Sequence, residues 1–320
     1  MRTYISSNTI FKKAGTFVCF AFLLFSVSAC TTFDVPTTSS VASTGLPTKH
    51  TIQNVPVIPQ DDHYCGPAAL ATVAQYNGYN LSQDKAAEMV YTPGRKGTFQ
   101  HDVVSAMQRT GLLAVPVNTT ETMMEEVAAD NPVLIFQNLG LSWKPFWHYS
   151  VIAGYDLPER KLLVHGGSKE SKWKSFSTIG KTWKRTGFWG YVGVPAGEIP
   201  PTASEEDLLQ ATAALETAGL PDQAAKSYSA IQKAFPNSAG ASFGLGNIAM
   251  TRENYSVAEK YYRQALSKEQ GHVYAANNLA YALSKQGKRT EACTHLKSHM
   301  SGSVKASEML ADSYKELCRN

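Results

Sequence analysis

The sequence has 320 residues, of which 43% are apolar and 18% are charged, with a formal net charge of +4. This length is enough for two domains of ordinary size, and the composition excludes a chain that is disordered throughout. The positive charge is dispersed, and the most basic stretch, residues 169–184, is interpreted as a solvated loop and strand edge. No nucleic-acid partner is therefore expected.

The first thirty residues have the plan of an export signal. Two lysines precede an apolar run over residues 14–27, which is shorter than the about 20 residues of a membrane span. The run ends in Val27-Ser28-Ala29-Cys30, which resembles a bacterial lipobox. The resemblance implies that residues 1–29 are removed and that lipidated Cys30 anchors the chain in a membrane. The alternative is an ordinary signal peptide with a chance cysteine. Thr31 stands where Asp would imply inner-membrane retention, so a periplasm-facing position at the outer membrane is expected.

The next part of the chain predicts a tether and a mixed domain. Residues 30–50 are rich in Thr, Ser and Pro and are expected to form the tether. Residues 51–195 show helical periodicity first and strand-like runs later, which predicts an α+β domain with segregated layers. The expected helices cover 68–76, 81–90 and 99–109, and the expected strands cover 132–136, 149–155, 161–165 and 187–194. Residues 196–203 break all periodicity and are expected to be a linker.

Residues 204–320 are helical in pattern and repetitive. Ala224, Ala258 and Ala292 recur at intervals of 34 residues (258 − 224 and 292 − 258), the period of tetratricopeptide repeats. Small residues at these positions let the two helices of a hairpin approach closely. The pattern predicts an all-α solenoid closed by a capping helix over 303–318, with a surface for a peptide or protein partner. An unrelated helical bundle is the alternative.

Five cysteines have different expected fates. Cys19 lies in the signal and Cys30 is the expected lipidation site, which leaves Cys65 as the candidate nucleophile. Cys293 and Cys318 both fall in the helical C-terminal region. In an oxidising compartment they could pair, and buried unpaired cysteines are equally consistent with the sequence.

Cys65 begins a helix-like run, Cys65-Gly66-Pro67-Ala68-Ala69. Only a thiolate attacks well, and a position near the positive end of a helix favours it. His148 opens a strand-like run about 80 residues later and is the candidate base, able to form an ion pair with the thiolate. Gln60 would donate its amide to a developing oxyanion, joined by the backbone N–H of Cys65. Each residue alone has an ordinary structural explanation, but together they predict a thiol acyl-transfer site.

Residues 53–194 resemble the papain-like cysteine peptidases that cleave bacteriocin and peptide leaders after a double glycine, and their stand-alone relatives. The resemblance rests on three segments, 55–60, 65–70 and 148–155. It implies a papain-like α+β fold and peptide-bond hydrolysis through a thioester, with Gln60, Cys65 and His148 in the roles given above.

The sequence departs from that family at the third member of the triad. The family has an Asp, usually followed by Pro, on the strand after the histidine strand, whereas residues 161–168 contain no acid. Asp156 lies in the preceding turn and is expected to be too far along to orient His148. His165, Ser168, a backbone carbonyl or a water are the remaining alternatives, and the loss of an acid puts turnover in doubt.

These observations predict a lipid-anchored cysteine peptidase of the bacterial cell envelope with a helical repeat domain behind it. No Cys-x-x-Cys or His-Glu-x-x-His spacing occurs, so neither a metal nor another cofactor is expected. The alternatives are a weak or inactive peptidase-like scaffold, a cell-wall peptide amidase, and acyl or transamidase chemistry on the same thioester. The substrate and its cleavage site are not specified by the sequence.

Overall fold

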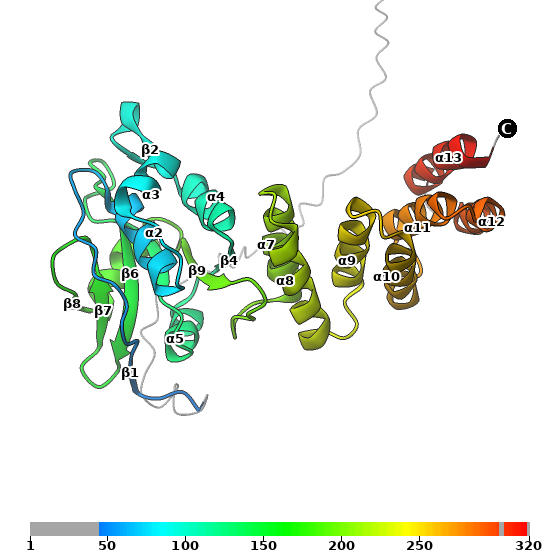
Figure 1. The fold of residues 1–320 in the computed structure, drawn as a ribbon. Helices are drawn as coiled ribbons and strands as arrows, with labels where there is room; N and C mark the ends of the chain where they lie inside the picture. Colours follow the sequence, from blue (N-terminus) through cyan, green and yellow to red (C-terminus); the bar gives the residue numbers. More distant parts are fainter. Residues whose placement is uncertain (1–44, 301–303, 319–320) are drawn as a thin grey trace, which may run out of the picture. The chain divides into compact units, whose positions relative to one another are not determined.

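The structure is a computed structural model that describes residues 45–300 and 304–318 (Figure 1). The predicted signal, the lipidation site Cys30 and most of the tether lie outside the described residues. Within the described ranges, no helix combines the length and the apolar character needed to cross a bilayer.

An antiparallel sheet of seven strands lies at the centre of the N-terminal domain (Figure 1). Six strands follow the order β4-β9-β5-β6-β7-β8, and β1 pairs with the C-terminal half of β6. A separate two-stranded hairpin, β2–β3, surrounds the short 3₁₀ helix η1. The strands are β1 (Lys49–Thr51), β2 (Tyr91–Thr92), β3 (Gly97–Thr98), β4 (Leu112–Pro116), β5 (Val133–Asn138), β6 (Trp147–Asp156), β7 (Lys161–His165), β8 (Lys172–Ser175) and β9 (Gly190–Pro195), and η1 is Pro93–Arg95.

Helices cover both faces of this sheet. Helices α2 (Cys65–Tyr76), α3 (Gln83–Val90) and α4 (Gln100–Thr110) pack with Leu134 of β5. Val133 and Ile135 belong to a second core with α5 (Thr120–Ala128) and α6 (Phe176–Lys184). Because alternate residues of a strand point to opposite faces, the two cores lie on opposite sides of the sheet.

The α+β class predicted from the sequence is confirmed, with differences in detail. The three expected helices match α2, α3 and α4, and Ser82 caps α3 by accepting a hydrogen bond from the Lys85 backbone. Strand β4 and helices α5 and α6 were not predicted, and they interrupt the expected order of helices first and strands later.

The basic stretch 169–184 is only in part the solvated strand edge that was expected. It forms edge strand β8 and then α6, whose Phe176, Ile179 and Trp183 are buried at helical spacing. The lysines occupy the opposite, exposed side, so the charge obscured an amphipathic helix.

The C-terminal region consists of stacked helix pairs followed by a final helix. The bounds are α7 (Glu205–Thr217), α8 (Pro221–Ala234), α9 (Ala239–Thr251), α10 (Tyr255–Lys268), α11 (Val273–Lys285), α12 (Arg289–His299) and α13 (Val304–Cys318). Ala224, Ala258 and Ala292, the residues that revealed the repeat, are fully buried. A Cβ on Gly246 would lie 2.5 Å from the Tyr262 ring, which shows how closely α9 and α10 approach.

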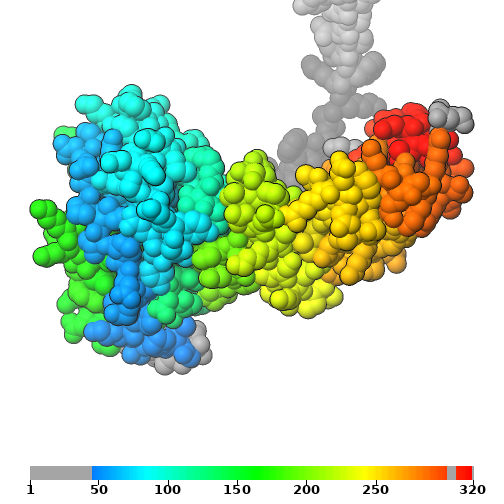
Figure 2. Space-filling view, in the orientation of Figure 1, coloured from blue at the N-terminus to red at the C-terminus, as the bar shows by residue number. Residues whose placement is uncertain are grey.

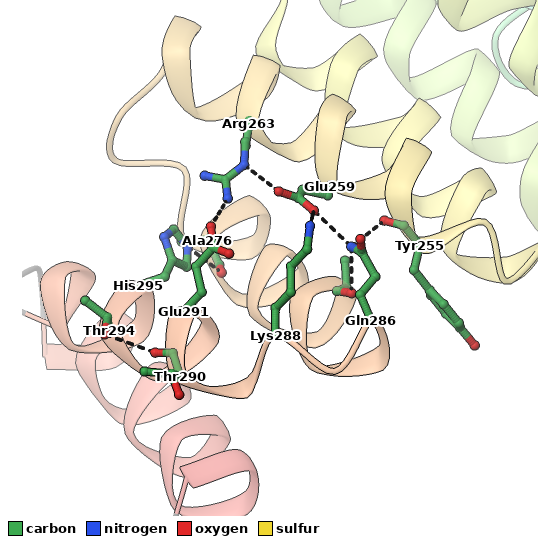
Figure 3. A network of polar contacts seen from close by, with 11 residues as sticks. Tyr255, Glu259, Arg263, Ala276, Gln286, Lys288, Thr290, Glu291, Thr294 and His295 are labelled. Atoms are coloured by element: carbon green, nitrogen blue, oxygen red, sulfur yellow. Dashed lines mark hydrogen bonds and ion pairs between the residues drawn. The ribbon is translucent and has the colours of Figure 1, made fainter.

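A polar network connects the second and third helix pairs (Figure 3). Glu259 accepts hydrogen bonds from Arg263 (3.0 Å), Gln286 (3.0 Å) and Lys288 (2.7 Å), and Arg263 also pairs with Glu291 (2.5 Å). Burial alone would raise the pKa of Glu259, but these donors outweigh it and lower the pKa to about 2. The network therefore stabilises the charged carboxylate between adjacent repeats.

The segment between the two domains is packed against both of them. Val194 and Ala196 share one buried cluster with Leu208 of α7. Thr202 donates through its backbone N–H (3.0 Å) and its hydroxyl to the buried carboxyl of Glu126 in α5. Burial raises the pKa of Glu126, against the opposing effect of these donors. Residues 196–203, expected to be a linker, are therefore tied to the folded domains, with Ala196 and Pro200 buried and Glu198 and Pro201 exposed.

The two C-terminal cysteines are paired. A disulfide connects Cys293 in α12 with Cys318 at the end of α13. This settles the alternative that the sequence left open, and it attaches the final helix to the last repeat.

Candidate active site

Cys65 lies at the first position of α2, where the helix leaves backbone N–H groups without intrahelical partners. The preceding residue, Tyr64, makes no side-chain capping bond, so no side chain competes for these donors. The thiol is half-buried and interacts with the backbone of Tyr149, Gly66 and Cys65 itself. The start of the helix therefore directs its free donors at the sulfur.

Burial raises the pKa of the Cys65 thiol, and the three backbone hydrogen bonds offset this only in part. The backbone at the helix start does lower the pKa, as expected, but the desolvation of a negative sulfur outweighs it. The net direction of the shift favours the thiol over the thiolate, so attack would need a base.

The β2–β3 hairpin closes over the start of α2. A Cβ on Gly66 would lie 2.7 Å from the Thr98 side chain, so the residue after Cys65 has room only for hydrogen. The Tyr149 hydroxyl donates to the Thr98 carbonyl oxygen at 3.2 Å. These contacts hold the hairpin, the helix start and strand β6 together around the thiol.

His148 is the second residue of β6, next to the Tyr149 whose backbone contacts the thiol. Its Nε2 atom lies 3.2 Å from the backbone carbonyl oxygen of Gly166. A carbonyl can only accept, so this bond places the proton of a neutral ring on Nε2 and leaves the lone pair on Nδ1. Burial lowers the pKa of His148, with an opposing contribution from Gly166. The ring therefore rests as a neutral imidazole whose hydrogen bond goes to Gly166.

Gln60 reaches the same place from the segment that precedes α2. Residues 45–64 cross the surface of the domain on their way to α2 (Figure 2). The Gln60 backbone N–H donates to the Gly167 carbonyl oxygen at 2.9 Å, and its side chain lies over Gly167. A Cβ there would lie 2.6 Å from the Gln60 Cδ. Among the described residues, the buried Gln60 Oε1 has no hydrogen-bond partner.

The Gly166–Gly167 turn therefore contacts two predicted site residues, His148 and Gln60. The third, Cys65, contacts the backbone of Tyr149, the residue after His148. Gly166 holds the imidazole, and Gly167, with φ of +76°, leaves space for Gln60. Neither glycine was singled out from the sequence. A pair of glycines directly after the strand that follows the histidine strand was the available signal.

The side chains considered as a third triad member are engaged elsewhere. Asp156 pairs with Lys49 at 2.6 Å, which lowers its pKa, and His165 contacts the Pro56 carbonyl at 3.3 Å. Ser168 donates to the Glu170 carbonyl at 2.6 Å. Of the alternatives that the sequence left open, the backbone carbonyl is the one that contacts the imidazole.

Metal ligands do not gather here. In the parts of the chain that the structure describes, no group of three or more His, Cys, Asp or Glu side chains is arranged to hold a metal ion.

Two family models match successive parts of the chain. Residues 52–191 match the Peptidase_C39 like family, and residues 208–266 and 246–298 match the tetratricopeptide repeat. No curated protein matches the chain.

Solved structures resemble the two parts separately. A putative C39-like peptidase from Bacillus anthracis is 19% identical and covers 46% of this chain and 97% of its own, with a TM-score of 0.40. The peptidase domain of Streptococcus ComA, a bi-functional ABC transporter involved in a quorum sensing pathway, is 21% identical and covers 44% and 99%, with a TM-score of 0.36. The first tetratricopeptide domain of Spaghetti (RPAP3), bound to an HSP90 peptide, is 16% identical and covers 35% and 94%, with a TM-score of 0.31.

Proposed function

We propose that the protein is a cysteine peptidase whose C-terminal repeats bind a protein or peptide. The proposal starts from the match of the chain to the Peptidase_C39 like family and to the tetratricopeptide repeat. Cys65 is the proposed nucleophile, His148 the base and Gln60 an oxyanion donor. The observation that supports this most is the arrangement around the Gly166–Gly167 turn. A thiol at an uncapped helix start lies against the neighbour of His148, and one turn contacts both the imidazole and Gln60.

The chemistry would follow from the resting states of the two side chains. The Nδ1 lone pair of neutral His148 takes the thiol proton as the sulfur attacks the peptide carbonyl carbon. The negative charge on the carbonyl oxygen is stabilised by the Gln60 amide and the Cys65 backbone N–H. The imidazolium then protonates the leaving amine as the C–N bond breaks, which leaves a thioester on Cys65. A water, deprotonated by His148, hydrolyses the thioester and regenerates the thiol.

The Gly166 carbonyl would act in place of the missing acid. It fixes the tautomer and the orientation of the ring, as a carboxylate does, but it carries only a partial negative charge. Hydrogen bonds to charged groups exceed neutral ones by about 1 kcal/mol. Imidazolium formation during attack is therefore stabilised less, and a turnover about fivefold below that of a carboxylate-assisted site is expected.

The remaining parts of the chain would bring substrate to this site. The repeats are the proposed surface for a peptide or protein, in keeping with the partner-binding role of such solenoids. Lipidated Cys30 is the proposed membrane anchor, with the domain facing the periplasm. Both assignments extend the peptidase proposal without being needed for it.

The direct test is labelling of the full chain by an electrophilic thiol probe, combined with peptide cleavage followed by mass spectrometry. Labelling should be lost in Cys65→Ser and strongly reduced in His148→Ala. His165→Ala is the matched control, because this imidazole also binds a backbone carbonyl but at Pro56. A trapped acyl group on Cys65 would identify the thioester. Full cleavage by Cys65→Ser would exclude the proposal.

A peptidase-like scaffold is the second candidate function. It is favoured by the raised pKa of Cys65 and by the neutral carbonyl partner of His148, since both weaken the nucleophile–base pair. In that case the folded wild-type chain would neither react with the probe nor cleave peptides, while binding through the repeats would persist.

A further inference from the structure

The β5–β6 hairpin, residues 138–147, displays large apolar side chains to solvent. Trp143 is 78% exposed, Phe146 63% and Leu141 53%. Two more, Trp147 and Leu139, are about half exposed at the base of the same hairpin. Such a concentration at one tip is unlike the scattered single apolar residues of an ordinary surface.

The backbone of this hairpin is fixed by internal hydrogen bonds, so the display is built into the fold. The Asn138 side-chain oxygen accepts from the N–H groups of Gly140 and Phe146, each at 3.0 Å. Arg185 donates to the carbonyl oxygens of Asn138 (3.0 Å) and Gly140 (2.6 Å). Leu141 and Lys144 close the tip by exchanging backbone bonds. Several polar backbone groups of the hairpin are thus paired, which lowers the cost of entering an apolar medium.

The two chain segments that contain the hairpin and α6 carry charge of one sign. Residues 138–155 and 171–197 contain no Asp or Glu, although Glu170 directly precedes the second segment. Arg185 contacts the hairpin directly, and α6 packs against β5. The same two stretches carry six cations, Lys144, Lys172, Lys174, Lys181, Lys184 and Arg185. An apolar, aromatic tip beside exposed cations is complementary to a surface with anionic groups above an apolar interior.

We propose that this hairpin inserts into the interface of an anionic lipid bilayer. Trp143 and Phe146 would sit at the depth of the headgroups, where aromatic side chains are favoured. Lys144 and the basic face of α6 would contact anionic headgroups. Insertion needs no contribution from the predicted anchor at Cys30, although a chain held at the membrane would dock more readily.

Insertion of the hairpin into the bilayer would also define the class of substrate. This step of the inference rests on the proposed peptidase function. Trp147 is adjacent to His148, so the inserted hairpin holds the candidate active site close to the membrane surface. Polypeptide segments lying on the bilayer or emerging from it would reach Cys65 first. Substrates would therefore be membrane-associated polypeptides.

The test is quenching of tryptophan fluorescence in the full chain on vesicles whose acyl chains carry bromine. One set of vesicles contains phosphatidylcholine alone and the other equal parts of phosphatidylcholine and phosphatidylglycerol. Trp143→Phe should abolish most of the quenching, whereas Trp173→Phe, which alters an exposed tryptophan of β8, should not. Lys144→Gln should lower the ratio of quenched to unquenched Trp143 about fivefold on anionic vesicles only.

Two results would overturn the proposal. One is equal quenching in the Trp143 and Trp173 variants on both vesicles. The other is a Phe146→Ser variant that keeps full quenching but raises the KM for peptides, which would make the hairpin a substrate-binding surface. Repeating the quenching with Cys65→Ser separates the two proposals, because docking should persist in this variant whether or not the chain is a peptidase.

Discussion

The Nε2 atom of His148 and the carbonyl oxygen of Gly166 are 3.2 Å apart, and in the proposed site this contact would take the place of the missing carboxylate. The backbone oxygen cannot be removed by mutation, but a side chain can be added beside it. A Cβ on Gly166 would lie 3.5 Å from His148 Nε2 and 3.6 Å from the Ser150 hydroxyl, both ordinary contacts.

Gly166→Asp should therefore restore an acidic partner to the imidazole. The added carboxylate would raise the pKa of His148 and stabilise the imidazolium that forms during attack. We expect kcat for peptide cleavage to rise about fivefold. Gly166→Asn controls for the added volume and should give a smaller gain. If Gly166→Asp raises the pKa of His148 in an NMR titration but not kcat, the missing acid is not what limits turnover.

Gly167→Ala should impair the oxyanion donor without touching the thiol or the imidazole. The added Cβ would collide with the Gln60 side chain and displace it. We expect kcat to fall about 100-fold, the lower range for the loss of an oxyanion donor, with KM little changed.

Gly78→Ala is the matched control for this substitution. Gly78 also has a positive φ, of +81°, but its Cβ would meet nothing within 4 Å. It bears the same backbone strain without the collision, so its kcat should stay close to wild type. Equal losses of activity in the two variants would show that strain, and not Gln60, is responsible.

The pH dependence of alkylation should distinguish a resting thiol from a resting ion pair. Burial raises the pKa of Cys65 and lowers that of His148 from their ordinary values. The thiolate fraction is therefore expected to grow only at alkaline pH, and the imidazole to stay neutral to a lower pH than an ordinary histidine. Iodoacetamide should react slowly at neutral pH and faster with increasing alkalinity. A fast reaction that is flat down to acid pH would instead reveal a thiolate–imidazolium pair.

The fall of kcat/KM at acid pH should report the protonation of His148, the proposed base. Because burial lowers the pKa of His148, activity should persist to a lower pH than an ordinary histidine base would allow and then fall as the imidazole gains a proton. In Gly166→Asp this fall should move to higher pH. A fall that stays in place would mean that another group controls it.

Cys318→Ser should loosen the C-terminal helix. The disulfide closes a loop with a sequence separation of 25, for which the chain-entropy relation gives about 3.5 kcal/mol of stability. Contacts such as the 2.6 Å bond from Ser313 to Asn277 would still hold α13 in part. We therefore expect a loss of up to that size in urea unfolding, and faster amide exchange in α13. Cys65→Ser, which removes an unpaired cysteine, should show neither effect.

Much of the fold followed from periodicity in the sequence. The 34-residue recurrence of alanine identified the repeats because close helix packing needs small residues there, and these alanines are buried. Helix α6 was missed because its lysines concealed the buried series that ends at Trp183. Strand β4, which lies directly after the Gly111 that ends α4 and closes at Pro116, was also missed, although both flanking residues are turn signals.

The candidate site was less predictable than the fold. The sequence offered Cys65, His148 and Gln60 by residue type, and these assignments remain predictions about chemistry. The partner of His148 was not predictable, because any residue supplies a carbonyl oxygen and only the three-dimensional path of the chain decides which one faces the ring. The direction of the Cys65 pKa shift was missed for a similar reason, since burial is a property of the fold.

The disulfide between Cys293 and Cys318 also makes the final state of the C-terminal helix depend on the redox environment. Such crosslinks persist where thiols are not kept reduced. A chain in a reducing environment would hold its last helix by non-covalent contacts alone, and oxidation would lock it. The C-terminal end of the repeat surface would then become fixed only after its thiols have been oxidised.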